Sequence, residues 1–148
     1  MWQIKKGYDH NTFENNDTSL NYSIDVYQES INKTFREYLV NFDYLTRIME
    51  NYGFTPLNRN ECAEIGLPTS IGSFQQMFGL MEQEISKNPK KKTQYGEAYK
   101  MTPKEKQISF YNSYFIYKKV RNVDTRAVYN TLIGSSKLQE QLEKLEEK

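Results

Sequence analysis

Two stretches near the start of the chain alternate between hydrophobic and polar side chains with a period of two. They are residues 1–9, "MWQIKKGYD", and residues 22–31, "YSIDVYQESI". Such alternation is typical of strands with one wetter face, so both stretches are predicted to be strands. The polar, asparagine-rich residues 10–21 predict a loop between them. The apolar positions are Trp2 and Ile4 in the first stretch and Tyr22, Ile24 and Val26 in the second.

A helical period begins in "TFREYLVNF", residues 34–42. From Phe35 to Tyr52, apolar side chains recur every three or four positions, which predicts an amphipathic helix of about four turns. Gly53 is placed to end this helix as a C-terminal cap. Thr34 and Glu37 match the capping box, in which the threonine and the glutamate each bond the other's backbone N–H. The apolar positions are Leu39, Phe42, Leu45, Ile48 and Met49.

After Gly53 the pattern turns to shorter elements. "FTPLN", residues 54–58, predicts a strand, and Pro56 favours a sheet edge because proline has no N–H to donate. Residues 58–107 have the character of an insertion. Within it, residues 65–73 and 86–97 predict loops. A helix is predicted from Ser73, as cap, to Ile85, and a short one is predicted at Thr102, Pro103 and Glu105.

Residues 107–120, "QISFYNSYFIYKKV", carry apolar side chains on both faces. This predicts a strand over 108–119 in the middle of a sheet. From Asp124 the chain predicts a helical tail. Its leucines are Leu138, Leu142 and Leu145, and two heptads are too few for a stable coiled coil, so a frayed, solvated end is expected.

Composition narrows the classes of function. The 148 residues suit one domain or a large part of one. With 20 basic and 19 acidic residues, the net charge of +1 gives no global argument for a nucleic acid or membrane partner. Aromatic residues make up 14% of the chain, which argues for a folded core and supplies rings on which a base could stack. No apolar run reaches about 18 residues and no signal peptide is evident, so an intracellular protein without a membrane partner is expected.

Several kinds of site are excluded by residue type. His10 is the single histidine and Cys62 the single cysteine, so neither a zinc cluster nor an internal disulfide is expected. A Ser-His-Asp triad built on His10, in a polar loop, is disfavoured. No glycine-rich phosphate loop follows a strand. We therefore predict no catalytic residue and no metal ligand in this chain.

Glu37 has two interpretations. The local pattern favours a helix cap, where the negative charge also suits the positive end of the helix. Alternatively, the carboxylate faces a cleft and accepts hydrogen bonds from a ligand. A guanine presents a ring N–H and an amino group side by side, and one carboxylate can accept both. The basic run Lys90, Lys91 and Lys92 is a weaker candidate for binding phosphate or RNA, with a solvated loop as the default interpretation.

Two longer stretches carry a family resemblance. "EYLVNFDYLTRIMENYGF", residues 37–54, resembles the Glu-Phe-Leu-Val-x-Phe helix of eukaryotic and viral mRNA cap guanine N-7 methyltransferases. "MTPKEKQISFYNSYFIYKKV", residues 101–120, resembles the closing strand of the same enzymes. "WQIKKGYD", "IDVYQESINKTFREYLVNF" and "LMEQE" are closest to the forms found in large DNA viruses. The resemblance covers residues 2–123, with the motifs in the family's order and spacing.

The resemblance implies an α/β fold, namely the C-terminal half of a class I S-adenosylmethionine-dependent methyltransferase with a Rossmann-like sheet. Residues 22–29, 54–58 and 108–119 would be strands five, six and seven, with a helical insertion at 58–107. The seventh strand would run antiparallel between the fifth and the sixth. On this basis residues 1–123 form the C-terminal part of the methyltransferase domain and 124–148 a helical tail.

The family's site residues transfer only where the motifs match. Glu37 falls on the glutamate that contacts the cap guanine, and Tyr38 on the aromatic position after it. Ungapped alignment places Asn112 where several members have a stacking tyrosine, with Tyr111 beside it and Tyr114 on the face of Asn112. This departure leaves three candidate positions for contact with the guanine.

The family's cofactor-binding motifs are absent from this chain. S-adenosylmethionine would be bound mainly by an N-terminal half, and the isolated chain is expected to be inactive and to expose apolar sheet surface. The implied partners are the capped 5′ end of mRNA and the N-terminal half or other capping-enzyme domains, in a viral factory or virion if the protein is viral. The alternatives are a non-catalytic RNA-binding or protein-interaction module that retains half of the fold, and a helical adaptor using residues 74–85 and the leucine tail.

Overall fold

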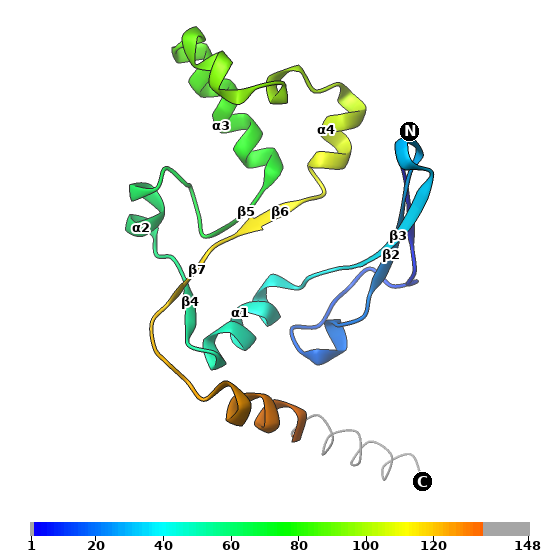
Figure 1. The fold of residues 1–148 in the computed structure, drawn as a ribbon, viewed down its shortest axis with the longest axis vertical. Coiled ribbons are helices and arrows are strands. Elements are labelled where there is room, and N and C mark those ends of the chain that lie inside the picture. Colours follow the sequence, from blue (N-terminus) through cyan, green and yellow to red (C-terminus); the bar gives the residue numbers. More distant parts are fainter. Residues whose placement is uncertain (1, 135–148) are drawn as a thin grey trace.

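A computed structural model describes residues 2–134 of the chain (Figure 1). It is a mixed α/β structure with small antiparallel sheets. The strands are β1 (Trp2–Lys6), β2 (Ser23–Gln28), β3 (Lys33–Tyr38), β4 (Phe54–Pro56), β5 (Ile71–Ser73), β6 (Ser113–Phe115) and β7 (Tyr117–Lys119). The α-helices are α1 (Phe42–Asn51), α2 (Arg59–Glu64), α3 (Phe74–Lys87) and α4 (Pro103–Ser109). Short 3-10 helices are η1 (Asp17–Ser19), η2 (Glu29–Ile31), η3 (Pro89–Tyr95) and η4 (Ala98–Lys100).

The first three strands form one antiparallel sheet in the order β1-β2-β3. The alternation of residues 1–9 and 22–31 therefore predicted β1 and β2 correctly. A tight connection through η2 joins β2 to β3, and Asn32 closes it with φ of 48°, a left-handed conformation that asparagine tolerates well. Across the hairpin, Arg36 donates to both carboxylate oxygens of Asp25, at 2.9 and 3.2 Å. This hydrogen bonding holds the pKa of Asp25 below its ordinary value.

The predicted helix over 35–52 is wrong in its first part. Residues 33–38 form β3, and the helix begins only at Phe42. Asn41 is the N-cap, since its side-chain oxygen accepts from the backbone N–H groups of Asp43 and Tyr44. The capping box of Thr34 and Glu37 therefore does not form. The prediction for the end of the helix is confirmed, because Gly53 follows it with φ of 84°.

The second half of the chain holds two separate two-stranded antiparallel sheets, β4-β7 and β5-β6. The predicted edge strand at 54–58 is confirmed as β4. The predicted helix after Ser73 is confirmed as α3, and Thr102 and Glu105 form the expected capping box of α4. Helix α2, with its own capping box between Asn58 and Glu61, was not predicted.

The prediction of one central strand over 108–119 is wrong. Helix α4 extends to Ser109, and two short strands follow with Ile116 between them. Phe115 is 52% exposed. Among residues 2–134, β6 pairs with β5 and β7 pairs with β4, and neither of them pairs with β2. The apolar pattern on both faces has another cause. Residues of one face, Phe110, Tyr114 and Ile116, line a groove beside α3, while the ring of Phe115 packs at a tilt against Phe42 of α1.

Few side chains are fully buried. Val26, Cys62, Phe78 and Met81 are the buried hydrophobic residues of the described chain. The three-stranded sheet leaves large apolar side chains in solvent, which agrees with the expectation of exposed apolar sheet surface: Trp2 is 43%, Ile4 38% and Phe35 43% exposed.

The final described segment is helical from residue 125 to 134. Asp124 accepts from the backbone N–H groups of Arg126 and Ala127, so the predicted start of the tail at Asp124 is confirmed. The predicted leucine repeat at Leu138, Leu142 and Leu145 lies outside the described residues. Within residues 2–134, no helix has the length and apolar character needed to cross a membrane.

Candidate nucleotide-binding cleft

Glu37 lies on β3, opposite Ile24 of the central strand. Ile24 in turn lies opposite Lys6 of β1. Residues directly opposite in an antiparallel pair point to the same face. The side chain of Glu37 is exposed, and in residues 2–134 its carboxylate has neither a hydrogen-bond nor an ion-pair partner. The structure thus leaves this carboxylate available to a ligand.

The sheet face that carries Glu37 is largely apolar and is called the apolar face below. By the period of two along each strand, its members are Trp2, Ile4 and Lys6 from β1, Ile24, Val26 and Gln28 from β2, and Lys33, Phe35 and Glu37 from β3. Lys6 does not neutralise Glu37, since its ammonium donates to Asn11 at 2.9 Å and lies 4.7 Å from the ring centre of Tyr8. The apolar face therefore ends in an unpaired negative charge.

A cleft of about 770 Å³ separates this face from helix α4 and the turn after it. Figure 1 shows α4 beside the end of the sheet that carries the N-terminus. One wall of the cleft comes from β1 and the other from residues about 100 positions later in the sequence. Its lining residues are Trp2, Ile4, Thr102, Lys104, Glu105, Gln107, Ile108 and Tyr111. The predicted site residue Tyr111, 70% exposed, thus lines a cleft whose opposite wall belongs to the face of Glu37.

Tyr38 is not brought together with Glu37. It lies opposite Ser23, on the other face of the sheet, and is 59% exposed. Adjacent residues of a strand point in opposite directions. The two predicted site residues therefore lie on opposite faces of the sheet.

Asn112 and Tyr114 lie apart from the cleft. The side-chain amide of Asn112 donates to the carbonyl oxygens of Ile108 and Ser109, each at 3.2 Å, and so satisfies the end of α4. The hydroxyl of Tyr114 donates to the carbonyl oxygen of Thr69 at 3.1 Å. Its ring lines an apolar groove of about 540 Å³ beside α3. Of the three aromatic or polar candidates on this segment, only Tyr111 faces the cleft.

The basic run Lys90, Lys91 and Lys92 lies on η3 and packs on its own neighbours. Lys91 forms an ion pair with Glu84 of α3 at 3.1 Å, and the ammonium of Lys92 lies 4.5 Å from the ring centre of Tyr99. The hydroxyl of Tyr95 also donates to Glu84, and this bond, followed by that from Lys91, lowers the pKa of the carboxyl. Two of the three lysines thus have local partners.

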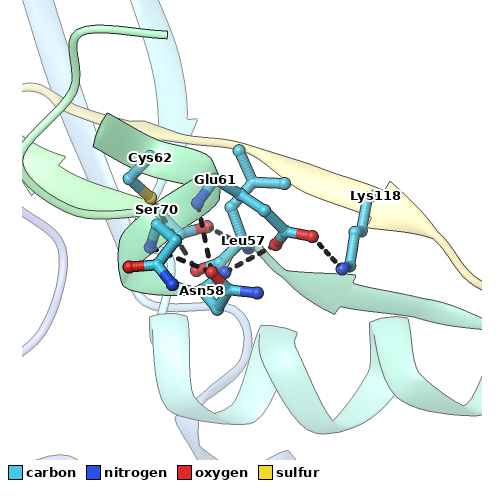
Figure 2. Close-up of polar contacts among 7 residues, drawn as sticks. Leu57, Asn58, Glu61, Cys62, Ser70 and Lys118 are labelled. Carbon is cyan, nitrogen blue, oxygen red and sulfur yellow. Dashed lines mark hydrogen bonds and ion pairs between the residues drawn. The ribbon is translucent and has the colours of Figure 1, made fainter. Parts of the chain in front are cut away.

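The densest polar cluster of the second half holds the strands together (Figure 2). Glu61 accepts from the backbone N–H of Asn58 at 2.8 Å and forms an ion pair with Lys118 of β7. The hydroxyl of Ser70 accepts from the N–H of Leu57 at 3.0 Å and donates to the carbonyl oxygen of Ile116. Cys62 is buried beside this cluster.

Each of Asn58, Glu61, Ser70 and Lys118 has a hydrogen-bond or ion-pair partner in the protein, so the cluster's role is structural. No group of three or more His, Cys, Asp or Glu side chains in the described chain is arranged to hold a metal ion.

Sequence reasoning missed the residues that complete the cleft, above all Trp2, Lys104 and Gln107. Trp2 is the only tryptophan of the chain and was placed correctly on one side of β1. Its position opposite α4 depends on a contact between distant segments, which no local pattern reveals.

The chain was compared with protein-family models, with curated proteins and with solved structures, and none of these comparisons finds a match.

Proposed function

We propose that this chain is the cap guanine-binding part of an mRNA guanine N-7 methyltransferase, the enzyme that transfers a methyl group from S-adenosylmethionine to the 5′ cap. The proposal begins from the family resemblance of residues 2–123. The observation that carries it further is the state of Glu37: the carboxylate is exposed, unpaired within residues 2–134, and not used as a helix cap.

A carboxylate in this state suits the recognition of guanine. Its two oxygens can accept the ring N–H and the amino group of one guanine edge, and charge-assisted hydrogen bonds of this kind are among the stronger ones. Adenine presents no such pair of donors on that edge. Glu37 would hold the guanine in one orientation and leave N-7 exposed, so its contribution to the reaction would be positioning.

The residues of this chain do not fit S-adenosylmethionine. The loops before α2 and α3 end in Asn58 and Ser73, which use their side chains to cap the helices, and neither junction has a run of glycines. We therefore assign the cofactor to an N-terminal half of the methyltransferase domain. The other partners in the proposal are the capped mRNA and further capping-enzyme domains, in a cytoplasmic viral factory or virion if the protein is viral.

The resemblance expects the last strand to pair antiparallel with both the strand at 54–58 and β2. Within residues 2–134, β7 pairs antiparallel with β4, and the pairing with β2 is not formed. The exposed apolar face, with Trp2, Ile4 and Phe35, would be covered by the N-terminal half. The same exposed face also favours the second candidate, a non-catalytic module that pairs with another protein.

Calorimetric titration with GTP and ATP tests the proposal, because these nucleotides differ at the base edge that Glu37 would contact. We expect the chain to prefer GTP and Glu37→Gln to lose that preference, by about 5- to 150-fold, the usual range for a two-bond base contact. Glu64→Gln is the matched control, since it removes the same charge from an exposed position on α2. Unchanged GTP preference in Glu37→Gln would refute the role of Glu37.

A further inference from the structure

The cleft between β1 and α4 has two exposed aromatic rings on its opposite walls. Trp2 comes from β1 and is 43% exposed, and Tyr111 follows α4 and is 70% exposed. Exposed rings of this size carry large apolar area, and their flat faces accept any nucleic-acid base by stacking. A site of this kind binds bases without reading their sequence.

The polar residues of the cleft suit a phosphate beside such a base. Lys104 and Gln107 are three positions apart, so they lie on one side of α4. No ion pair to Lys104 is present among residues 2–134. Glu105 also lines the cleft and keeps its negative charge, with its carboxylate held by the N–H and the hydroxyl of Thr102 at 2.7 and 2.8 Å. The cleft therefore offers one cation without an ion pair, one amide and one capping carboxylate next to two rings.

The cleft lies too far from Glu37 for one base to touch both. Glu37 and Trp2 are two strands apart and four residues apart along the strands. At about 4.8 Å between strands and about 3.3 Å per residue, their backbones are separated by roughly 16 Å on the same face. A guanine held at Glu37 and a base held in the cleft would belong to different nucleotides of one strand.

We infer that this cleft binds the transcribed nucleotides that follow the cap, with Trp2 and Tyr111 stacking on bases and Lys104 contacting a phosphate. The inference rests on the proposed function, since it extends the same substrate from Glu37 across the apolar face. It assigns to β1 and α4 a role in holding single-stranded RNA, and it predicts little preference among RNA sequences.

The single tryptophan provides a direct reading of the cleft, because all tryptophan fluorescence comes from Trp2. The full chain is titrated with GTP, with a capped RNA of six transcribed nucleotides, and with the same RNA carrying a 5′-hydroxyl. We expect the capped RNA to bind more tightly than GTP and to quench Trp2, and GTP to bind without quenching it.

Substitutions separate the two parts of the site. Tyr111→Ala should weaken capped RNA by about 5- to 150-fold and leave GTP unchanged, while Tyr111→Phe, which keeps the ring, should restore binding. Lys104→Gln should lower the salt dependence of RNA binding by about 0.7 in the log–log slope. Tyr129→Ala and Lys5→Gln are the controls, since Tyr129 lies in the helix at 125–134 and Lys5 on the opposite face of the sheet.

The two proposals fail in different ways. If GTP binding depends on Glu37 but capped RNA binds no more tightly than GTP and leaves Trp2 fluorescence unchanged, the cleft is not an RNA site. If RNA quenches Trp2 and needs Tyr111 while Glu37→Gln changes nothing, the cleft is an RNA site and the guanine role of Glu37 is wrong. If RNA still quenches Trp2 in Tyr111→Ala and binds with unchanged affinity, Tyr111 does not stack on a base and the stacking inference is wrong.

Discussion

The three-stranded sheet and the region between β4 and β7 differ in how many apolar side chains they bury. The sheet buries Val26 and keeps Trp2, Ile4 and Phe35 between 38% and 43% exposed, and β1 and β3 are each paired on one side only. The second region encloses Cys62, Phe78 and Met81 and ties its strands with satisfied polar groups. We propose that the second region serves as a scaffold and the sheet face as a surface for binding.

The largest expected difference between the two regions is the loss of unfolding free energy when a phenylalanine is replaced by alanine. Phe78 is 8% exposed, meets Phe110 edge-on at 5.6 Å and lies under the ammonium of Lys106 at 4.2 Å. Phe78→Ala should cost about 3 to 4 kcal/mol of unfolding free energy. Phe35→Ala, on the exposed sheet face, should cost about 1 kcal/mol or less. Urea unfolding of both variants checks this, and equal costs would remove the distinction between scaffold and surface.

The second prediction concerns the hydroxyl of Ser70, which is 7% exposed and bridges β4 to the segment between β6 and β7. Ser70→Ala leaves the N–H of Leu57 and the carbonyl of Ile116 without this partner and should cost about 2 kcal/mol. Ser30→Ala, at an exposed position in the hairpin of the sheet, is the control and should be nearly neutral. A neutral Ser70→Ala, measured by thermal unfolding, would show that this bridge does not hold the scaffold.

The smallest effect expected is a pH dependence. The hydrogen bond from Lys118, with that from Asn58, lowers the pKa of Glu61 from its ordinary value of 4.5. A lowered pKa in the folded chain means that Glu61 stabilises the fold fully above about pH 4.5 and loses this contribution as the pH falls through the folded value. Glu61→Gln should therefore reduce the loss of melting temperature between pH 7 and pH 3. If Glu61→Gln loses as much melting temperature between pH 7 and pH 3 as the unchanged chain does, the loss comes from other carboxylates, such as Asp25.

Local patterns predicted much of the fold. Alternation identified β1 and β2, and cap residues identified the starts of α3 and α4. The failure at Thr34–Glu37 has a physical cause, because Thr-x-x-Glu describes a capping box only where a helix follows. Here Asn32 turns the chain into a hairpin, and the stronger cap, Asn41, stands directly before Phe42. Both signals are in the sequence and outweigh the capping-box pattern of Thr34 and Glu37.

The candidate site was less predictable than the fold. Five residues were predicted to contact the guanine: Glu37, Tyr38, Tyr111, Asn112 and Tyr114. The structure places only Glu37 and Tyr111 on or opposite the same face. The sequence could not separate Tyr111 from Asn112 and Tyr114, because a strand was predicted where α4 ends and the chain turns. The pairing of Trp2 with α4 across the cleft depends on tertiary packing, which a local period does not contain.

In the proposed function, Glu37 acts on a ligand and not on the fold. The most direct test measures two properties of Glu37→Gln together, the free energy of unfolding and the ratio of GTP to ATP affinity. We predict a change in stability of no more than about 0.5 kcal/mol, as for an exposed strand position, with loss of the guanine preference. A variant that loses stability by 1 kcal/mol or more while keeping the guanine preference would contradict the account.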